Sequence, residues 1–268
     1  MSLRIQTNIA AFDAERNLTA TSNRMQNSMA RLSSGYRINN AADDAAGLAI
    51  SEKLRAQIGG LDQATRNSQD AISLVQTAEG QLNEVHSMLQ RVRELAVQYK
   101  NGTLSTQDRT AIQSEVNQLG SEIQRIGNAA AFNGISLLAS AGTITFQVGA
   151  NDGDSISVAT VSLGTAVATG VFDLSATGTT DISEIDDAIN NVSAQRATFG
   201  AVQNRLEHTI NNLSVYQENL TASESQIRDV DMASEMVKFT KDQILQQAGT
   251  SMLSQANQLP NSVLSLLR

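Results

Sequence analysis

The chain has 268 residues, no cysteine, one proline and a net charge of −8 at pH 7, and only 3% of its residues are aromatic. The absence of cysteine excludes disulfides and thiolate metal sites, and the acidic balance argues against a nucleic-acid partner. This composition favours long helices over a compact globular core. We expect neither a membrane-spanning segment nor a secretory signal, so the chain stays in the cytoplasm or leaves by a route that reads no such signal.

The first segment, up to about residue 32, has the apolar spacing of an amphipathic helix. Burial of its apolar side chains is too little to offset the conformational entropy lost when a lone helix becomes ordered. We therefore expect it to pack against the similarly amphipathic C-terminal segment and against neighbouring subunits. Its apolar residues are Ile5, Ile9, Phe12, Leu18, Met25, Met29 and Leu32.

The stretch "LSSGYRINNAADDAAGLAIS", residues 32–51, predicts a connection between two helices. Gly35 and the pair Asn39 and Asn40 suit a turn, and we expect Asp43 and Asp44 in the first turn of the next helix, where negative charge is favoured. The small residues that surround them would let another backbone approach closely. A metal site is the alternative, but no further ligands follow at the spacing of a calcium-binding loop.

A long helix is predicted from Ile50 onward, because apolar residues recur there at alternating intervals of four and three. Gly102 ends it, and Ser105 is well placed to cap a second helix, which ends near the Asn133 and Gly134 turn. The expected seam of the first helix is Ile50, Leu54, Leu61, Ala64, Ala71, Val75, Ala78, Leu82, Val85, Leu89, Val92, Ala96 and Tyr99. That of the second is Ile112, Val116, Leu119, Ile123 and Ile126.

The period changes to two between about Thr143 and Val161, where "TITFQVG" and "SISVATV" flank "ANDGD". An Asp-Gly turn between alternating runs predicts a β-hairpin, which explains the acids without a bound calcium ion. The Gly/Thr-rich stretch from about Leu163 to Thr180 is expected at the outer surface and tolerant of change. The helical period returns at Ile182. The predicted fold is mainly α, a long coiled-coil-like bundle formed by both chain ends with a small β-hairpin insertion.

No catalytic or metal site is predicted. His86 and His208 are the only histidines, and neither lies in an HExxH pattern. A nucleophile, a base and an orienting residue do not occur together in a recognisable motif. We therefore expect a protein that is not an enzyme and needs no cofactor.

The motif "QRVREL" is the strongest candidate for a binding site. With Leu89, Val92 and Ala96 in the seam, Arg91 and Leu95 fall one turn apart beside it. An exposed apolar residue next to an arginine can form a binding hot spot. Ordinary packing between helices is the alternative, and periodicity alone favours it.

Several long motifs resemble bacterial flagellin, and they occur in that family's order. They are residues 32–51 with the continuation "AISEKLRAQIGGLDQATRNSQDAISLVQTAEGQLNE", then "LQRVRELAVQ", "FNGISLL", "FQVGAN", "GAVQNRLEHTINNL", "ENLTASESQIRDVDMASEM" and "ANQLPNSVLSLLR". The resemblance covers residues 1 to about 140 and about 182 to 268. Where many flagellins carry large outer domains, this chain has only the hairpin and the Gly/Thr-rich stretch, and so resembles a minimal flagellin.

The resemblance implies three regions. Residues 1–42 and 228–268 would form an inner domain of terminal helices that lines the filament tube. Residues 43–140 and 181–227 would form a helical rod domain, and residues 141–180 a surface segment. The implied assembly contacts are Ile5, Ile9, Phe12, Leu18, Leu32, Ala42, Asp43, Val237, Ile244, Leu264 and Leu267.

The resemblance also implies a function: a structural subunit, exported unfolded through the flagellar secretion channel, that polymerises with itself into an extracellular filament. The implied partners are the flagellar cap and hook-filament junction proteins, an export chaperone and the flagellin-sensing Toll-like receptor of vertebrates, with no nucleic acid and no membrane. For the receptor, the matching residues are Arg91, Leu95 and Glu115. A hook-filament junction protein and a cytosolic helical scaffold are the alternatives.

Overall fold

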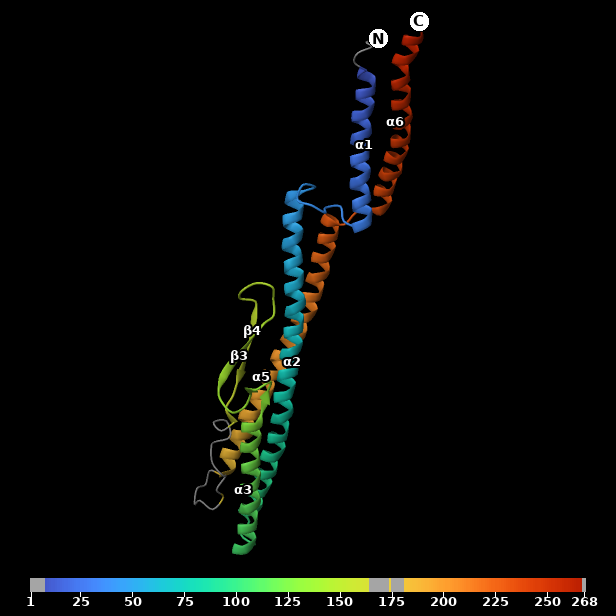
Figure 1. Ribbon diagram of the computed structural model, residues 1–268. Helices are drawn as coiled ribbons and strands as arrows, with labels where there is room; N and C mark the ends of the chain where they lie inside the picture. Colours follow the sequence, from blue (N-terminus) through green and yellow to red (C-terminus); the bar gives the residue numbers. More distant parts are fainter. Residues whose placement is uncertain (1–7, 164–173, 175–180, 267–268) are drawn as a thin grey trace. The chain divides into compact units, whose positions relative to one another are not determined.

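The computed structural model describes residues 8–163, Leu174 and residues 181–266. The chain divides into two compact units, one made of Met1–Ala56 with Asn219–Arg268 and the other of Gln57–Glu218. Two long helices, α2 and α5, run from one unit into the other, so each unit is built from both halves of the chain (Figure 1). Among the described residues, no helix combines the length and apolar character that a membrane crossing needs.

The first unit contains a pair of helices from the two ends of the chain. Helix α1, Ile9–Ser34, lies beside helix α6, Met232–Leu266 (Figure 1). Asn8 caps α1 by accepting a hydrogen bond from the backbone N–H of Ala11. Its side-chain amide also donates to the carbonyl of Ala256, at 2.8 Å. The predicted packing of the N-terminal segment against the C-terminal segment is confirmed.

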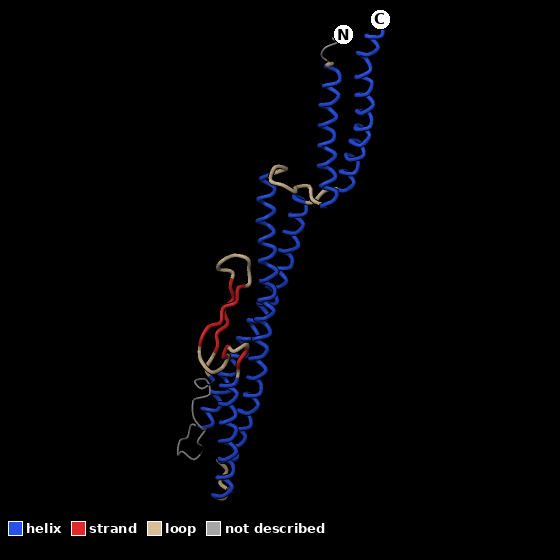
Figure 2. The backbone as a smooth tube through the Cα atoms, in the orientation of Figure 1, coloured by secondary structure: helices blue, strands red, loops and turns tan. Residues whose placement is uncertain are grey.

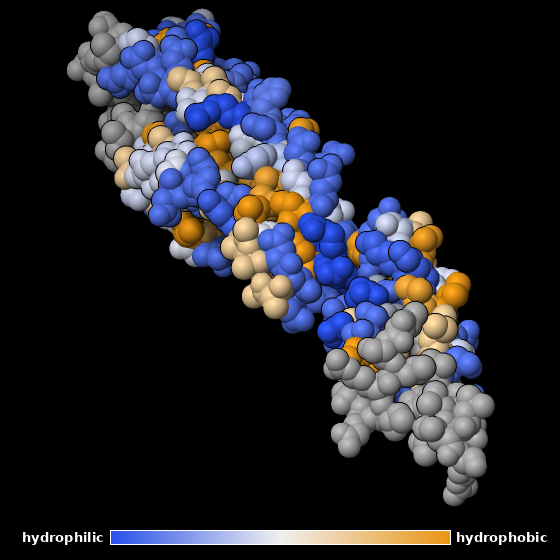
Figure 3. Space-filling model, turned by 90° about the horizontal axis from the view of Figure 1, so that it is seen from above, coloured by the Kyte–Doolittle hydropathy of each residue, from blue (hydrophilic) through white to orange (hydrophobic). Residues whose placement is uncertain are grey.

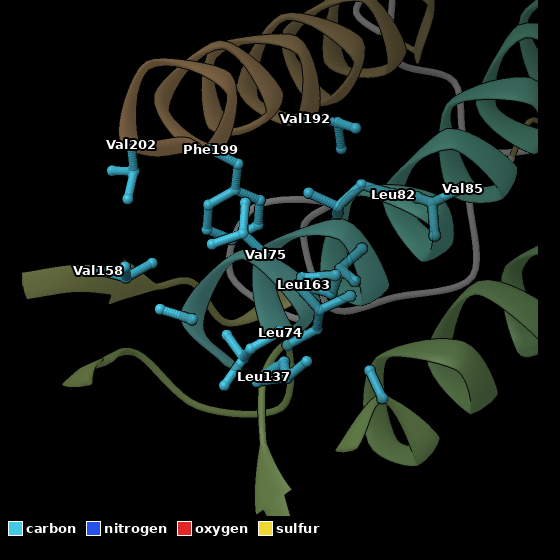
Figure 4. Close-up of a cluster of buried hydrophobic side chains, with 14 of the residues drawn as sticks. Leu74, Val75, Leu82, Val85, Leu137, Val158, Leu163, Val192, Phe199 and Val202 are labelled. Atoms are coloured by element: carbon cyan, nitrogen blue, oxygen red, sulfur yellow. The ribbon is translucent and has the colours of Figure 1, made fainter. Parts of the chain in front are cut away.

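The second unit is built on three helices: α2, Ala45–Tyr99, α3, Thr106–Ala129, and α5, Asp181–Arg228. Their apolar stripes meet in a core that also receives side chains from the β-hairpin, because residues three and four apart share one face of a helix. Figure 4 shows Phe199 of α5 on the side of Val75 of α2, and Val202 of α5 on the side of Val158 of β4. The core residues labelled there are Leu74, Val75, Leu82, Val85, Leu137, Val158, Leu163, Val192, Phe199 and Val202.

The predicted seam of α2 is buried along most of its length but not at its start. Leu61 and the seam residues from Ala64 to Ala96 are buried, whereas Ile50 is 51% exposed. The predicted cap of α3 is confirmed. The Ser105 hydroxyl accepts from the N–H of Asp108, and the Asp108 carboxylate accepts from the N–H of Ser105, a reciprocal capping box.

In the part of the chain that the structure describes, four short strands form two antiparallel hairpins: β1, Ala131–Phe132, with β2, Ile135–Ser136, and β3, Gly142–Gln147, with β4, Ser155–Thr160. In the larger one, Gly142 pairs with Thr160 and Gln147 with Ser155. Residues of β4 alternate between exposed and buried, as a half-buried strand requires. Gly153 has a φ of 96° in the connecting turn, a conformation that favours glycine. The predicted β-hairpin is confirmed.

The stretch from about Leu163 to Thr180 was expected at the outer surface, and this is wrong for two of its residues. Leu163 is buried in the main core, and Leu174 is buried in a smaller cluster with Val92 and Ile185. The backbone N–H of Leu174 also donates to the Gln113 side chain, at 2.9 Å. Residues 164–173 and 175–180 lie outside the described residues. Two leucines therefore anchor this stretch to the helices.

Candidate assembly surface on the terminal helices

The contact between α1 and α6 has a polar centre, which the amphipathic pattern of the two ends did not predict. Its centre is Glu235, which is 2% exposed. Ser28 Oγ donates to Glu235 Oε1 at 2.7 Å, and Lys238 Nζ donates to Glu235 Oε2 at 2.9 Å. Arg31 adds a weaker ion pair at 3.9 Å. Burial alone would raise the pKa of Glu235, but the hydrogen bonds from Lys238 and Ser28 hold the pKa below its usual value.

Further contacts fix the pair at two other levels. Arg24 Nε lies 3.4 Å from the buried carboxylate of Asp242. Nearer the free ends, Leu18 packs on Gly249, where an added Cβ would meet Leu18 Cδ1 at 3.2 Å. These contacts set the two helices antiparallel in one register.

Large apolar side chains remain exposed on both helices of the pair. Phe12 is 63% exposed, Val237 is 70% and Ile244 is 62%. Figure 3, seen from above, shows that hydrophobic residues, in orange, reach the surface of the molecule. Others that are exposed on the pair are Ile9, Met29, Met232, Met236, Leu245 and Met252. A surface of this kind is typical of a protein that associates with other chains.

The implied assembly residues divide into four groups. Four of them are large, apolar and exposed: Ile9, Phe12, Val237 and Ile244. Leu18 and Leu32 are half-buried, and Ala42 and Asp43 are exposed in the turn before α2. The side chains of Ile5, Leu264 and Leu267 lie outside the described part of the chain.

The connections between the terminal helices and the long helices form a joint, defined here as residues 35–44 and 228–231 (Figure 2). The N–H of Arg37 donates to the carbonyl of Arg228 at 2.7 Å, and the N–H of Val230 donates to the carbonyl of Gly35 at 3.0 Å. The Arg228 guanidinium lies 4.7 Å from the ring centre of Tyr36 and 2.7 Å from the Glu52 carboxylate. The two connections are therefore tied together by backbone and side chains.

Asp43 and Asp44 serve this joint as turn and cap residues. Helix α2 begins at Ala45, so both lie just before the helix and not in its first turn, where the sequence placed them. Asp43 accepts from the N–H groups of Asn40 and Asn39, which lowers its pKa, and Asp44 accepts from the N–H of Gly47 at 2.8 Å. In the described part of the chain, no group of three or more His, Asp and Glu side chains could hold a metal ion.

The residues of "QRVREL" separate into surface and core. Arg91 and Glu115 form an ion pair between α2 and α3, with Nη2 and Oε1 2.9 Å apart and side chains 51% and 45% exposed. Hydrogen bonding and charge from Glu115 raise the pKa of Arg91. Leu95 is only 2% exposed, so the expectation that it lies exposed beside the seam is wrong. Because α2 contacts both α3 and α5, its buried stripe is wider than a two-helix seam and includes Leu95.

Comparison with known proteins places these features in one family. A family model described as the bacterial flagellin N-terminal helical region matches residues 5–143, and one described as the bacterial flagellin C-terminal helical region matches residues 182–267. The two matches leave out residues 144–181, which include most of the larger hairpin and the stretch that follows it. The chain therefore belongs to the bacterial flagellin family, whose members are structural subunits of the flagellar filament.

Individual relatives agree over nearly the full chain. A flagellin of Halalkalibacterium halodurans is 53% identical over 98% of this chain and 99% of its own length. A flagellin of Bacillus subtilis is 49% identical over 99% of this chain and 100% of its own length. The flagellar filament 33 kDa core protein of Treponema phagedenis is 48% identical, with 98% of this chain and 99% of its own length covered.

Solved structures show the same kind of fold. The crystal structure of Bacillus cereus flagellin matches with 35% identity and a TM-score of 0.50, over 55% of this chain and 88% of that one. A putative flagellar hook-associated protein from Vibrio parahaemolyticus matches with a TM-score of 0.59 over 70% of this chain and 100% of its own. At 15% identity, the second match shows the fold alone.

Proposed function

We propose that this chain polymerises with itself into an extracellular flagellar filament and that α1 and α6 form its main contact with other copies. One observation carries the proposal: the two helices pair around a buried polar centre and leave Phe12, Val237 and Ile244 exposed. Apolar area of this kind gains free energy only when another molecule covers it. In a filament of identical subunits, that molecule is a further copy in a contact that does not close.

Deletion from Arg228 to the C-terminus tests this proposal. The shortened chain should remain a soluble and largely helical monomer that does not polymerise, because α1 loses its partner. Sedimentation and electron microscopy would measure polymer, and circular dichroism would measure helix content. A Val97→Ser variant, which changes an exposed apolar residue on α2 and leaves both terminal helices as they are, is the matched control and should polymerise normally. Filaments from the shortened chain would refute the pairing argument.

The proposal includes a route of export and assembly. The chain would leave the cell unfolded through the flagellar secretion channel, with an export chaperone as an earlier partner and the cap and hook-filament junction proteins as later ones. The absence of cysteine supports this route, because no disulfide has to be broken before the chain is threaded. Filaments sheared from intact cells should contain this chain. Recovery only from the cytosol would favour the alternative of a helical scaffold.

A second proposed activity is recognition of the monomer by the flagellin-sensing Toll-like receptor of vertebrates. The exposed ion pair of Arg91 and Glu115 supports it, because an arginine on a partly apolar helix surface can serve as a hot spot. Leu95 would contribute indirectly, by fixing the helix that carries Arg91.

The receptor proposal can be tested with a matched pair of variants. Arg91→Ala should weaken binding of the monomer by about 2 kcal/mol, roughly thirtyfold, and Glu115→Ala by less. Arg93→Ala is the control, because Arg93 lies on α2 like Arg91, has a similar exposure of 47%, and pairs with an acid on a neighbouring helix, Asp186 of α5. Circular dichroism should be unchanged in all three. If the Arg91→Ala, Glu115→Ala double variant gave an unchanged reporter-cell response, the receptor proposal would be wrong and the motif would serve only in packing between helices.

A further inference from the structure

One flank of the α1–α6 pair carries an open hollow of about 300 Å³. Two carboxylates, Glu235 and Asp242, lie buried at its floor. Four cationic side chains surround them, two from each helix: Arg24, Arg31, Lys238 and Lys241. Arg31 also pairs with Asp43 of the joint at 3.5 Å, so four positive charges face three carboxylates and an excess of one positive charge remains. The hollow therefore favours a further carboxylate, and none of its own residues supplies one.

The ion pairs of the two helices identify a donor and an acceptor for this site. Among the described side chains of α1 and α6, every charged group except two takes part in an ion pair. The exceptions are Glu15, an exposed carboxylate on α1, and Lys241, an exposed ammonium group in the hollow. One acid and one base are thus left without a partner.

These two groups cannot meet within one chain. Arg24, which lines the hollow beside Lys241, lies nine residues after Glu15 on α1. Nine residues correspond to about two and a half helical turns, so Glu15 is on the opposite side of α1 and about 14 Å away along its axis. Complementary groups on opposite sides of one subunit produce a head-to-tail contact, which repeats without closing.

We propose that Glu15 of one copy enters the hollow of a second copy and pairs with its Lys241. The inference rests on the proposed self-assembly and adds a specific contact to it. The apolar side chains of the pair supply most of the contact, whereas this ion pair selects which flank of one copy faces the next. A charge pair of this kind acts on register and specificity more than on affinity.

Charge reversal and its rescue test the pairing. Glu15→Lys and Lys241→Glu should each raise the critical concentration for seeded polymerisation at low salt about tenfold, because each sets like charges together. The Glu15→Lys, Lys241→Glu double variant should return to within about threefold of the original chain. An equimolar mixture of the two single variants should also polymerise, because each supplies the charge that the other lacks. High salt should reduce all of these differences.

Two controls separate the pairing from net charge. Lys53→Glu and Glu84→Lys make the same charge changes at exposed positions on α2, and both should polymerise like the original chain. Circular dichroism of each monomer checks the fold. The pairing would be overturned if the single variants had the critical concentration of the original chain, or if the controls had that of the single variants. A double variant that is not rescued would overturn it as well. In all three cases the original chain still assembles, whereas its own failure to polymerise would overturn the proposed function.

Discussion

A carboxylate buried between two helices is stable only while it is paired, and Glu235 has three cationic or hydroxyl partners. Its pKa is lowered from 4.5 in the folded chain. The unfolded chain therefore binds the proton more readily, and the stabilisation by Glu235 is complete above about pH 4.5 and lost as the pH falls through the lowered pKa. The packing of α1 on α6 should thus weaken in acid.

Glu235→Gln tests this linkage. At neutral pH it should cost about 2 kcal/mol, because Lys238 and Arg31 lose a charged partner. It should also flatten the loss of stability in acid, because the titrating group is gone. Hydrogen exchange of α1 and α6 amides at neutral pH and below pH 4.5 would measure both effects. Exposed Glu84→Gln is the control; equal acid sensitivity in the original chain and Glu235→Gln would contradict the assignment.

Leu95 shows how one residue can change the interpretation of a motif. Its burial with Ile112 and Val116 predicts that Leu95→Ala lowers the free energy of unfolding by about 2 to 5 kcal/mol. Val97→Ala, two positions away and 51% exposed, should cost less than about 0.5 kcal/mol. Urea unfolding would measure both. Equal effects would mean that Leu95 does not lie in the core.

At the scale of elements, the cap of α3 follows directly from local sequence. Ser105→Ala removes the hydroxyl that accepts from the Asp108 N–H and should lower stability by about 1 kcal/mol. Thermal unfolding would show this as a reduced melting temperature. Ser105→Asp keeps an acceptor at the cap position and should recover much of the loss. A Ser105→Ala variant as stable as the original would show that the cap contributes nothing.

The sequence predicted elements whose signals are local or periodic. The long seam of α2, the Ser105 cap and the Asp-Gly hairpin each depend on residues close together in the chain. The cap and the hairpin are confirmed, and the seam is confirmed from Leu61 to Ala96 but not at Ile50. The polar contact around Glu235 was not predictable, because periodicity shows where apolar residues gather but not which face meets another helix. Leu163 and Leu174 were missed because single leucines in a Gly/Thr-rich stretch carry no period.

The same limit applies to the candidate sites. Motif similarity assigned Arg91 and Glu115 to one candidate site, and the structure places Arg91 Nη2 2.9 Å from Glu115 Oε1. The hollow beside Lys241 had no such signal, because its residues come from two helices more than two hundred positions apart in the chain. Ionic contacts of that kind depend on the register of two distant segments, which a single sequence does not specify.

At the scale of the whole molecule, we expect the stretch between β4 and α5 to contribute to stability through Leu163 and Leu174, and its other residues to contribute little to assembly. Replacing residues 164–173 and 175–180 with Gly-Ser sequence of the same length, while keeping Leu163 and Leu174, should leave assembly and motility intact. Replacing all of residues 163–180 should lower stability by several kcal/mol, because two buried leucines are lost. Urea unfolding and a swimming assay would compare the two; equal behaviour would mean that the leucines are dispensable.

The joint has a mechanical consequence. A single polypeptide linker can rotate about its backbone bonds and so behaves as a swivel. Here the two connecting segments of the joint lie side by side. Backbone hydrogen bonds of Arg37 and Val230 and the stacking of Arg228 on Tyr36 hold them together, so neither segment can rotate without the other. Torque on α1 and α6 therefore passes to the start of α2 and the end of α5 through both connecting segments at once. A filament that drives motility has to transmit torque along its length. Two linked connections transmit torque, whereas a single freely rotating linker would not.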